Sequence, residues 1–324
     1  MRSDRRVGLV LGGGGAVGAA YHAGALTALE HDLGWDARAA QVIVGTSAGS
    51  LVGALLRLGV PAADLAALTV GASTEVTSES LASWIRDRPS FPPVTFRHLL
   101  HVPRLPSFAM LVGLARLTVK QRVVPISALS MLLPDGRETL APRQEFLDSI
   151  FDGTWPEEPL VVCAVRRRDW KRTLFSGDDH QGLLSTVLAA SCAVPGYFAD
   201  VRIGDESYID GGVISVTNAD VLARCDLDLV IVVSPMTGSA PWPSISHLAR
   251  RLCRKTLDAE LRSLRRHGIP TVVVEPGPDV TRYMSMDFMS EQASTEIVRS
   301  AFFDTGAQIT NNPLLRALKR RDAA

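Results

Sequence analysis

Short apolar runs alternate with segments of helical periodicity along this sequence. Residues 7–11 form an uninterrupted apolar run and predict a buried strand, and residues 18–30, with apolar side chains recurring on one side, predict a helix. Residues 41–45 predict a second short strand, and a second amphipathic helix follows it and ends at Gly59. The chain therefore opens as strand, helix, strand, helix.

The same alternation returns in the second half of the chain. Residues 160–165, 229–233 and 271–275 are apolar runs of strand length separated by helical stretches. Strands connected through helices form parallel sheets, and helices cover both faces of such sheets, so their strands are apolar throughout. The pattern predicts the α/β class, with a single domain over residues 5–315 and a basic C-terminal tail over residues 316–324.

The alternation is interrupted between about residues 73 and 142, where short apolar pieces and clustered prolines replace it. We interpret this stretch as an inserted helical cap. Its apolar side chains have two interpretations, a lid over a pocket for an acyl chain or ordinary packing of the cap. They are Phe108, Met110, Leu111, Leu114 and Leu117.

Composition and charge exclude some classes of partner. The chain is 46% hydrophobic, which supplies a packed core, and its 34 basic and 34 acidic residues give a formal net charge of zero. Without an overall positive field, no nucleic-acid partner is expected. The local exception is a helical stretch that begins at Leu248, and it is either a solvated helix face or a peripheral contact with an anionic membrane. Its basic residues are Arg250, Arg251, Arg254, Lys255, Arg262, Arg265 and Arg266.

Cysteine usage and the first residues bear on the compartment. The four cysteines are widely separated, lack the spacing of a zinc site and are interpreted as buried reduced thiols. Arginines before residue 7 and the apolar run after them imitate a signal peptide, but the run ends at residue 11 and four glycines follow it. No stretch approaches the roughly 18 apolar residues that span a bilayer. We expect a cytoplasmic protein, with peripheral membrane contact as a further expectation and the oligomeric state left open.

The sequence Gly-Thr-Ser-Ala-Gly at residues 45–49 is the first candidate for chemistry. Glycines two before and two after a serine, between an apolar strand and a helix, permit the sharp turn of a nucleophile elbow. That turn exposes the hydroxyl group of Ser47, and the helix below it adds amide donors and a partial positive charge. Ser47 is therefore the candidate nucleophile of an acyl hydrolase.

A glycine loop at residues 12–18 also lies between a strand and a helix. Successive amide groups without side chains can form a nest for an anion, and an ester under attack places negative charge on its carbonyl oxygen. The loop also satisfies the dinucleotide pattern GxGxxG, which would make the protein an oxidoreductase. That interpretation requires an acidic residue at the end of the next strand, where this chain has Gly45-Thr46-Ser47.

A serine nucleophile needs a base, and the histidines fit this role poorly. His247 and His267 lie in the basic helical stretch, where solvated positions are expected, and His22 is expected to pack or to brace the glycine loop. The better candidate is Asp210, which ends an apolar strand and precedes two glycines that permit close approach to another backbone. The alternative is an ordinary turn aspartate.

Four motifs in this order resemble the patatin-like phospholipase family. Residues 9–18 are similar to its oxyanion loop, residues 45–49 to its elbow, residues 210–212 to its Asp-Gly-Gly block, and residues 190–198 to the segment before that block. The resemblance covers most of the chain. It implies a three-layer α/β/α fold with a mainly parallel central sheet, lipid acyl esters as substrates, and neither metal nor cofactor.

The resemblance also implies a catalytic dyad in place of a triad. Ser47 would attack the ester and Asp210 would accept its proton directly, while Gly13, Gly14 and Gly15 would supply the donors of the oxyanion hole. Aspartate with its usual pKa near 4 is a weak base for a hydroxyl group, so the dyad requires direct contact in a cleft that excludes water.

One position departs from the family pattern. The family usually carries arginine or lysine where this chain has Val17. Two functions therefore stay open within this fold: a hydrolase of the phospholipase A or lysophospholipase kind, and a catalytically weak lipid-binding or regulatory protein.

Overall fold

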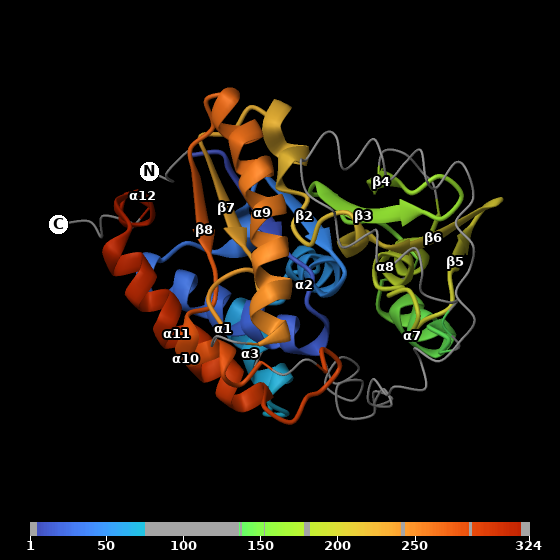
Figure 1. The fold of residues 1–324 in the computed structure, drawn as a ribbon, viewed down its shortest axis with the longest axis horizontal. Helices are drawn as coiled ribbons and strands as arrows, with labels where there is room; N and C mark the ends of the chain where they lie inside the picture. Colours follow the sequence, from blue (N-terminus) through green and yellow to red (C-terminus); the bar gives the residue numbers. More distant parts are fainter. Residues whose placement is uncertain are drawn as a thin grey trace.

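The computed structural model describes residues 5–74, 136, 138–151, 153–177, 182–240, 244–284 and 287–318. In this part of the chain eight strands form one sheet, and helices surround it (Figure 1). The strands are β1 (Val7–Leu11), β2 (Val42–Thr46), β3 (Leu160–Arg166), β4 (Lys171–Phe175), β5 (Val201–Ile203), β6 (Glu206–Asp210), β7 (Leu229–Val233) and β8 (Thr271–Val274).

The sheet is parallel in its larger part and antiparallel at one side. Its order is β5-β6-β3-β2-β1-β7-β8, and β4 pairs with β3 outside this path. The five strands from β3 to β8 in this order run parallel, with Leu11 of β1 opposite Gly45 on one side and Val233 on the other. Strands β4 and β6 run antiparallel to β3, and β5 runs antiparallel to β6. The predicted α/β class is confirmed, with a mixed sheet that is mostly parallel.

Helices form the two outer layers because successive side chains of a buried strand point to opposite faces. In β1, Leu9 and Leu11 join a core cluster with Leu26 of α1, whereas Val10 joins a second cluster with Leu257 of α9. Of the α-helices that the structure describes, all except α9 contribute residues to the first cluster: α1 (Gly15–Leu33), α2 (Ala48–Arg57), α3 (Ala62–Thr69), α7 (Ala141–Phe151), α8 (Leu184–Ser191), α10 (Pro278–Thr281), α11 (Ser294–Asn311) and α12 (Pro313–Arg316). The second cluster packs under α9 (Ile245–Arg266) and the 3₁₀ helix η5 (Ala219–Arg224). The arrangement is a three-layer α/β/α fold.

The ends of the helices differ from the predicted ends by a few residues. Helix α1 begins at Gly15 rather than residue 18, so the last glycines of the loop are already its first turn. It ends at Leu33, where Gly34 adopts φ 62° and its amide donates to the carbonyl of Glu30. A left-handed glycine is a common end for a helix because it has no Cβ to clash. The prediction failed at both ends because it counted only strongly apolar positions.

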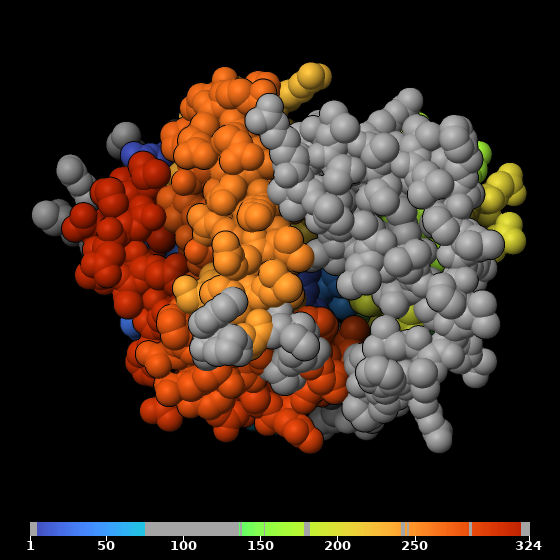
Figure 2. All heavy atoms as spheres, in the orientation of Figure 1, coloured from blue at the N-terminus to red at the C-terminus, as the bar shows by residue number. Residues whose placement is uncertain are grey.

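Helix α9 is the predicted basic amphipathic helix. Ser244 caps it by accepting a hydrogen bond from the amide of His247. The helix lies on the face of the molecule that is turned to the viewer (Figure 2, orange). Its buried side includes Cys253, Leu257 and Leu264, and its basic residues are mostly exposed or half-buried. Arg250 is the exception, because it is buried and donates to the carbonyls of Pro235 and Thr237.

Two predicted segments fall largely outside the described residues. The expected cap over residues 73–142 is described only at its ends, and the five apolar residues assigned to a lid, from Phe108 to Leu117, are not described. The expected tail over 316–324 is described only to residue 318. Among the helices that the structure describes, none is long and apolar enough to cross a membrane.

Candidate active site

Ser47 lies in a strained turn between β2 and α2. Its backbone adopts φ 53° and ψ −125°, a combination that residues with a side chain seldom adopt. The two flanking glycines make this turn possible by close contact. A Cβ atom on Gly49 would lie 2.0 Å from the carbonyl oxygen of Leu11, and one on Gly45 would lie 2.4 Å from the Cα of Ser50. The spacing of glycines around the serine thus has a steric cause in this fold.

The backbone of Ser47 is held from two sides. Its amide donates to the hydroxyl of Ser191 at 2.9 Å, and that hydroxyl donates to the carbonyl of Cys163 at 2.7 Å. Its carbonyl accepts from the amide of Ser50 at 2.8 Å and from the Ser50 hydroxyl at 2.6 Å. Helix α8, which ends at Ser191, therefore fixes the turn together with the first turn of α2.

Asp210 is buried next to Ser47. Asp210 is 5% exposed, and its carboxylate accepts a hydrogen bond from the amide of Gly212 at 2.7 Å. Burial raises the pKa of Asp210 from 3.8 to about 6, while the adjacent side chain of Ser47 and the amide of Gly212 oppose that rise. The structure therefore brings together two residues that are far apart in the sequence.

The Asp-Gly-Gly block turns against the neighbouring strand. The amide of Asp210 donates to the carbonyl of Ala193 at 2.9 Å. A Cβ atom on Gly211 would lie 2.4 Å from the carbonyl oxygen of Cys163 in β3, so this position needs glycine. The block then forms the 3₁₀ helix η4 (Gly211–Val213). The backbone approach expected from the two glycines is present at Gly211.

The glycine loop lies beside the serine turn. A Cβ atom on Gly13 would lie 3.3 Å from the Cβ of Ser47. The amide of Gly13 donates to the carbonyl of Val216 at 2.7 Å, so it is not available to a substrate in this structure. The donor role expected of Gly13 stays a prediction that would require this amide to leave Val216.

Gly14 and Gly15 are placed differently from Gly13. Gly14 is the N-cap of α1 and Gly15 is its first residue. The first amides of an α-helix have no carbonyl partner within the helix, and the positive end of the helix dipole lies there. Gly15 has φ 62°, and a Cβ atom there would lie 2.4 Å from the carbonyl oxygen of Phe288. These two amides are the candidate donors for an oxyanion.

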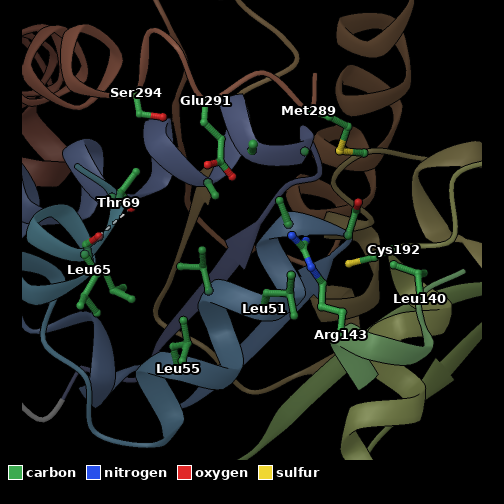
Figure 3. Close-up of a pocket in the computed structure, with 18 of the residues that line it drawn as sticks. Leu51, Leu55, Leu65, Thr69, Leu140, Arg143, Cys192, Met289, Glu291 and Ser294 are labelled. Atoms are coloured by element: carbon green, nitrogen blue, oxygen red, sulfur yellow. Dashed lines mark hydrogen bonds between the residues drawn. The ribbon is translucent and has the colours of Figure 1, made fainter. Parts of the chain in front are cut away.

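A narrow and mainly apolar cavity of about 150 Å³ opens at Ser47. Leu51 and Leu55 of α2 form one wall, and Arg143 extends from α7 into the space between Leu51 and Cys192 (Figure 3). Glu291 lines the opposite part of the same cavity. An apolar wall that begins at a nucleophile suits an acyl chain, because apolar surface is driven out of water into such a cavity.

Cys192 is the second possible nucleophile in this cavity. Burial, followed by the nearby carboxylate of Asp210, raises the pKa of its thiol to about 12. Arg143 and the side chains of Ser47 and Ser50 oppose this rise. Only a thiolate attacks esters efficiently, and a thiol with this pKa stays protonated near neutral pH. Ser47 therefore remains the candidate nucleophile.

The histidines take structural positions. His22 is buried in α1 and its Nε2 lies 2.6 Å from the carbonyl oxygen of Gly12, so it braces the glycine loop as expected. Burial lowers its pKa to about 4, which keeps the ring neutral. His267 is exposed and bonds the carbonyl of Ser263. Among the residues that the structure describes, no histidine lines the cavity at Ser47.

Val17 is buried in the core, with 2% of its surface exposed. A cation at this position would be placed in an apolar environment, which explains why valine suits this chain. Arg143 instead brings a cation into the cavity from α7, which follows the predicted cap in the sequence. Nothing in the sequence pattern had indicated Arg143.

Two other interpretations lose support at this site. In the described part of the chain, no group of three or more His, Cys, Asp or Glu side chains could hold a metal ion. The carboxylate that a dinucleotide would need after the second strand is missing, because β2 leads directly into Ser47. Asp36, the nearest acidic candidate, caps a 3₁₀ helix before β2 and pairs with Arg38.

Several supporting residues escaped the sequence analysis. Ser191 and Cys192 fall in the segment 190–198 that resembles the family, so their position had a signal but their contacts did not. Ser50 and Asn218 carried none. Asn218 reaches the residue before Ser47 from beyond the Asp-Gly-Gly block, through a hydrogen bond that only the folded chain creates.

Comparisons with known proteins agree with these motifs. The family model described as Patatin-like phospholipase matches residues 9–223. Among curated proteins, none matches this chain. Similar solved structures include VipD from Legionella pneumophila, with 14% identity, a TM-score of 0.43 and coverage of 94% of this chain and 67% of that chain.

Two more solved structures are similar to this chain at the same low level. The type III effector protein ExoU has 13% identity and a TM-score of 0.36, with coverage of 94% of this chain and 53% of that chain. Human GIVD cytosolic phospholipase A2 has 11% identity and a TM-score of 0.44, with coverage of 97% and 62%. The chain thus spans between 53% and 67% of the length of these three proteins.

Proposed function

The chain belongs to the patatin-like phospholipase family, and from that premise we propose that it hydrolyses carboxylic esters of lipids with Ser47 as the nucleophile and Asp210 as the base. The observation that carries the proposal is the place of Asp210 in a buried site beside Ser47, where the Ser47 side chain is close enough to lower the pKa of the carboxyl group. The family supports activity on lipid acyl esters. The assignment of the two residues rests on their geometry.

The reaction begins when the Ser47 oxygen attacks the ester carbonyl carbon and its proton passes to the Asp210 carboxylate. The amides of Gly14 and Gly15 hold the negative oxygen of the tetrahedral intermediate. When the intermediate collapses, the carbon–oxygen bond to the alcohol breaks, and the alcohol leaves with the proton from Asp210. Water then attacks the acyl-enzyme, gives a proton to Asp210, and releases the fatty acid as Ser47 recovers its proton.

The pKa of Asp210 supports its role as the base. A carboxylate with a pKa of 3.8 would hold a proton too weakly to draw it from a hydroxyl group, and burial raises this pKa to about 6. Above that pH the side chain is still mostly ionised and can accept a proton. No histidine is required for the step, which agrees with the cavity lining of the described residues.

The cavity supports a single-chain lipid such as a lysophospholipid, or one acyl chain of a phospholipid, as the substrate. Its leucine walls suit the chain, and Arg143 brings positive charge near the ester. The expected activity is of the phospholipase A or lysophospholipase kind. A panel of short p-nitrophenyl esters, lysophospholipids, phospholipids and triacylglycerols, with released fatty acid as the readout, tests whether lysophospholipids and phospholipids are the preferred substrates.

A fluorophosphonate probe tests the nucleophile directly, because it forms a covalent bond with an activated serine. We expect labelling of the wild-type protein and complete loss of labelling and ester hydrolysis in Ser47→Ala. Ser149→Ala is the matched control, since its exposed hydroxyl bonds only its own helix. Activity retained by purified Ser47→Ala would refute the proposed mechanism.

A catalytically weak lipid-binding protein is the second candidate, and Val17 is the observation that favours it. Without a cation in the glycine loop, a lipid could bind while turnover is slow. The same probe distinguishes the two functions. Binding of lysophospholipid without fluorophosphonate labelling of Ser47 would support the binding protein.

Peripheral contact with an anionic membrane is a further part of the proposal. Arg251, Lys255, Arg262 and Arg266 recur at intervals that place them on one side of α9, and all four are exposed. Sedimentation with vesicles of phosphatidylcholine alone or with added phosphatidylserine tests this contact. Binding only to the anionic vesicles, weakened by salt, is expected.

A further inference from the structure

One short segment contacts all three parts of the candidate active site. This linking segment, residues 215–219, follows the Asp-Gly-Gly block. The amide of Ser215 donates to the carbonyl of Gly211 at 3.3 Å, and the carbonyl of Val216 accepts from the amide of Gly13 at 2.7 Å. The side chain of Asn218 then reaches Thr46, the residue directly before Ser47. The base, the glycine loop and the serine turn are thus connected by five consecutive residues.

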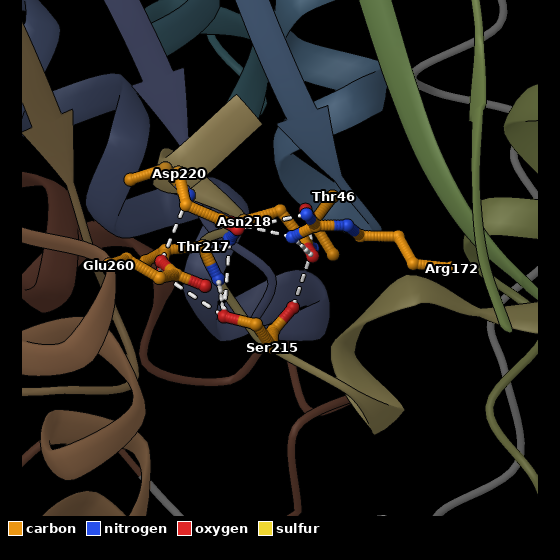
Figure 4. A network of polar contacts seen from close by, with 8 residues as sticks. Thr46, Arg172, Ser215, Thr217, Asn218, Asp220 and Glu260 are labelled. Atoms are coloured by element: carbon orange, nitrogen blue, oxygen red, sulfur yellow. Dashed lines mark hydrogen bonds and ion pairs between the residues drawn. The ribbon is translucent and has the colours of Figure 1, made fainter. Parts of the chain in front are cut away.

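Asn218 makes the contact with the serine turn. Its side-chain amide donates to the Thr46 hydroxyl at 3.0 Å and to the carbonyl of Ser215 at 2.7 Å, and its oxygen accepts from Arg172 at 3.2 Å (Figure 4). Asn218 and Thr46 are fully buried. The backbone of Asn218 is left-handed, with φ 54°, which asparagine tolerates better than most residues. Every polar atom of this side chain therefore has a defined partner.

One buried and two partly buried charged groups flank the linking segment on its two sides. Glu260 of α9 accepts from the Thr217 hydroxyl at 2.6 Å and from the amide of Ala219 at 2.9 Å. On the other side, Arg172 of β4 pairs with Asp220 at 2.6 Å (Figure 4). Burial raises the pKa of Glu260 to about 7, and the nearby carboxylate of Asp220 contributes to that rise. A carboxyl group such as that of Glu260 seldom occurs in a core unless it has hydrogen-bond partners. The network of hydrogen bonds around it therefore fixes the position of the linking segment.

We propose that Asn218 is a positioning residue for the proposed Ser47–Asp210 reaction, because its amide fixes Thr46 and thereby the place of the Ser47 hydroxyl relative to Asp210 and the glycine loop. The inference rests on the proposed function. The backbone of Ser47 is strained and persists only if its surroundings determine it. Reacting groups displaced by about 1 Å lose on the order of a hundredfold in rate, so a contact one residue away affects turnover.

Two substitutions remove the contact from opposite ends. Asn218→Gly deletes the amide and keeps a residue that accepts φ 54° without strain. Thr46→Val deletes the hydroxyl and keeps nearly the same shape, while Thr46→Ser retains the hydroxyl and is the matched control. Hydrolysis of a p-nitrophenyl ester is measured per active site, counted by fluorophosphonate titration, and thermal unfolding is followed in parallel.

We expect kcat to fall about ten- to hundredfold in Asn218→Gly and in Thr46→Val, with KM changed less than threefold. Thr46→Ser keeps most of the wild-type kcat. The double variant Asn218→Gly/Thr46→Val is expected to be no slower than the slower single variant, because both changes remove the same contact between Asn218 and Thr46. A contact that only stabilises the fold would lower the unfolding temperature and the number of active sites, without changing kcat per active site.

Three results would overturn the inference: wild-type kcat in folded Thr46→Val, equal losses in Thr46→Val and Thr46→Ser, or multiplied losses in the double variant. If Asn218→Gly does not fold, the comparison of Thr46→Val with Thr46→Ser decides the question alone. Failure of the proposed function looks different. In that case the wild-type protein itself shows no hydrolysis that depends on Ser47.

Discussion

The burial of Asp210 makes a quantitative prediction about stability. Its side chain is 5% exposed, and burial raises its pKa from 3.8 to about 6. One pKa unit corresponds to about 1.4 kcal/mol, so keeping this carboxylate ionised in the folded protein costs about 3 kcal/mol relative to the unfolded chain. Asp210→Asn removes the charge while its oxygen can still accept from the amide of Gly212. We expect this inactive variant to be more stable than the wild-type protein at neutral pH.

The sign of the pH dependence follows from proton binding. Between about pH 4 and pH 6 the folded protein holds a proton on Asp210 that the unfolded chain has released, so the free energy of unfolding falls as the pH rises. Above pH 6 the full cost is present, and below pH 4 it disappears. The advantage of Asp210→Asn should therefore grow from near zero at pH 4 to at most about 3 kcal/mol at pH 8.

Urea unfolding followed by circular dichroism at several pH values between 4 and 8 measures this difference. Asp205→Asn is the matched control, because Asp205 is exposed in the turn between β5 and β6. Its effect should stay within about 0.5 kcal/mol at every pH. An Asp210→Asn variant that is no more stable than the wild-type protein at pH 8 would refute the reasoning that the ionised carboxylate is costly there.

Three further predictions concern the same site and its surroundings. The value of kcat/KM for a neutral p-nitrophenyl ester should rise with pH around an apparent pKa of about 6, because Asp210 must be ionised to accept a proton; a flat profile from pH 4.5 to 9 would contradict this role. Gly49→Ala should lower the thermal unfolding temperature strongly and abolish hydrolysis, since the added Cβ would lie 2.0 Å from the Leu11 carbonyl oxygen; an active variant of normal stability would show that the turn relaxes easily. Iodoacetamide at pH 8 should alkylate the exposed Cys225 first, because burial raises the pKa of each of the other three thiols to about 12. Peptide mass spectrometry maps the alkylated positions, and early labelling of Cys192 in the cavity would contradict this order.

The strands of the parallel part of the sheet could be predicted because burial on both faces leaves a simple pattern. The runs at Val7–Leu11 and Leu229–Val233 match β1 and β7 from end to end. The antiparallel side was harder to foresee. Strand β4 consists of exposed and partly buried residues except for Phe175, and β5 has only three residues, so neither forms an apolar run. Each pairs antiparallel with the strand next to it in the sequence, β4 with β3 and β5 with β6.

The candidate site was predictable where glycine reports a steric requirement. Gly45 and Gly49 allow close backbone contact at Ser47, and Gly211 allows it at Asp210. The engagement of the Gly13 amide could not be foreseen, because the carbonyl that takes it lies far along the chain. Arg143 could not be foreseen for a similar reason, since only the folded chain brings α7 to the cavity.

The bond between Asn218 and Thr46 joins residues 172 positions apart in the sequence. Contacts of such long range form late in folding, because the chain between them must first be ordered. During synthesis, the serine turn leaves the ribosome long before Asp210 and the linking segment are made. A nascent chain thus carries the proposed nucleophile without the proposed base. In the proposed mechanism, the order of the motifs delays hydrolysis until most of the domain has been translated and folded.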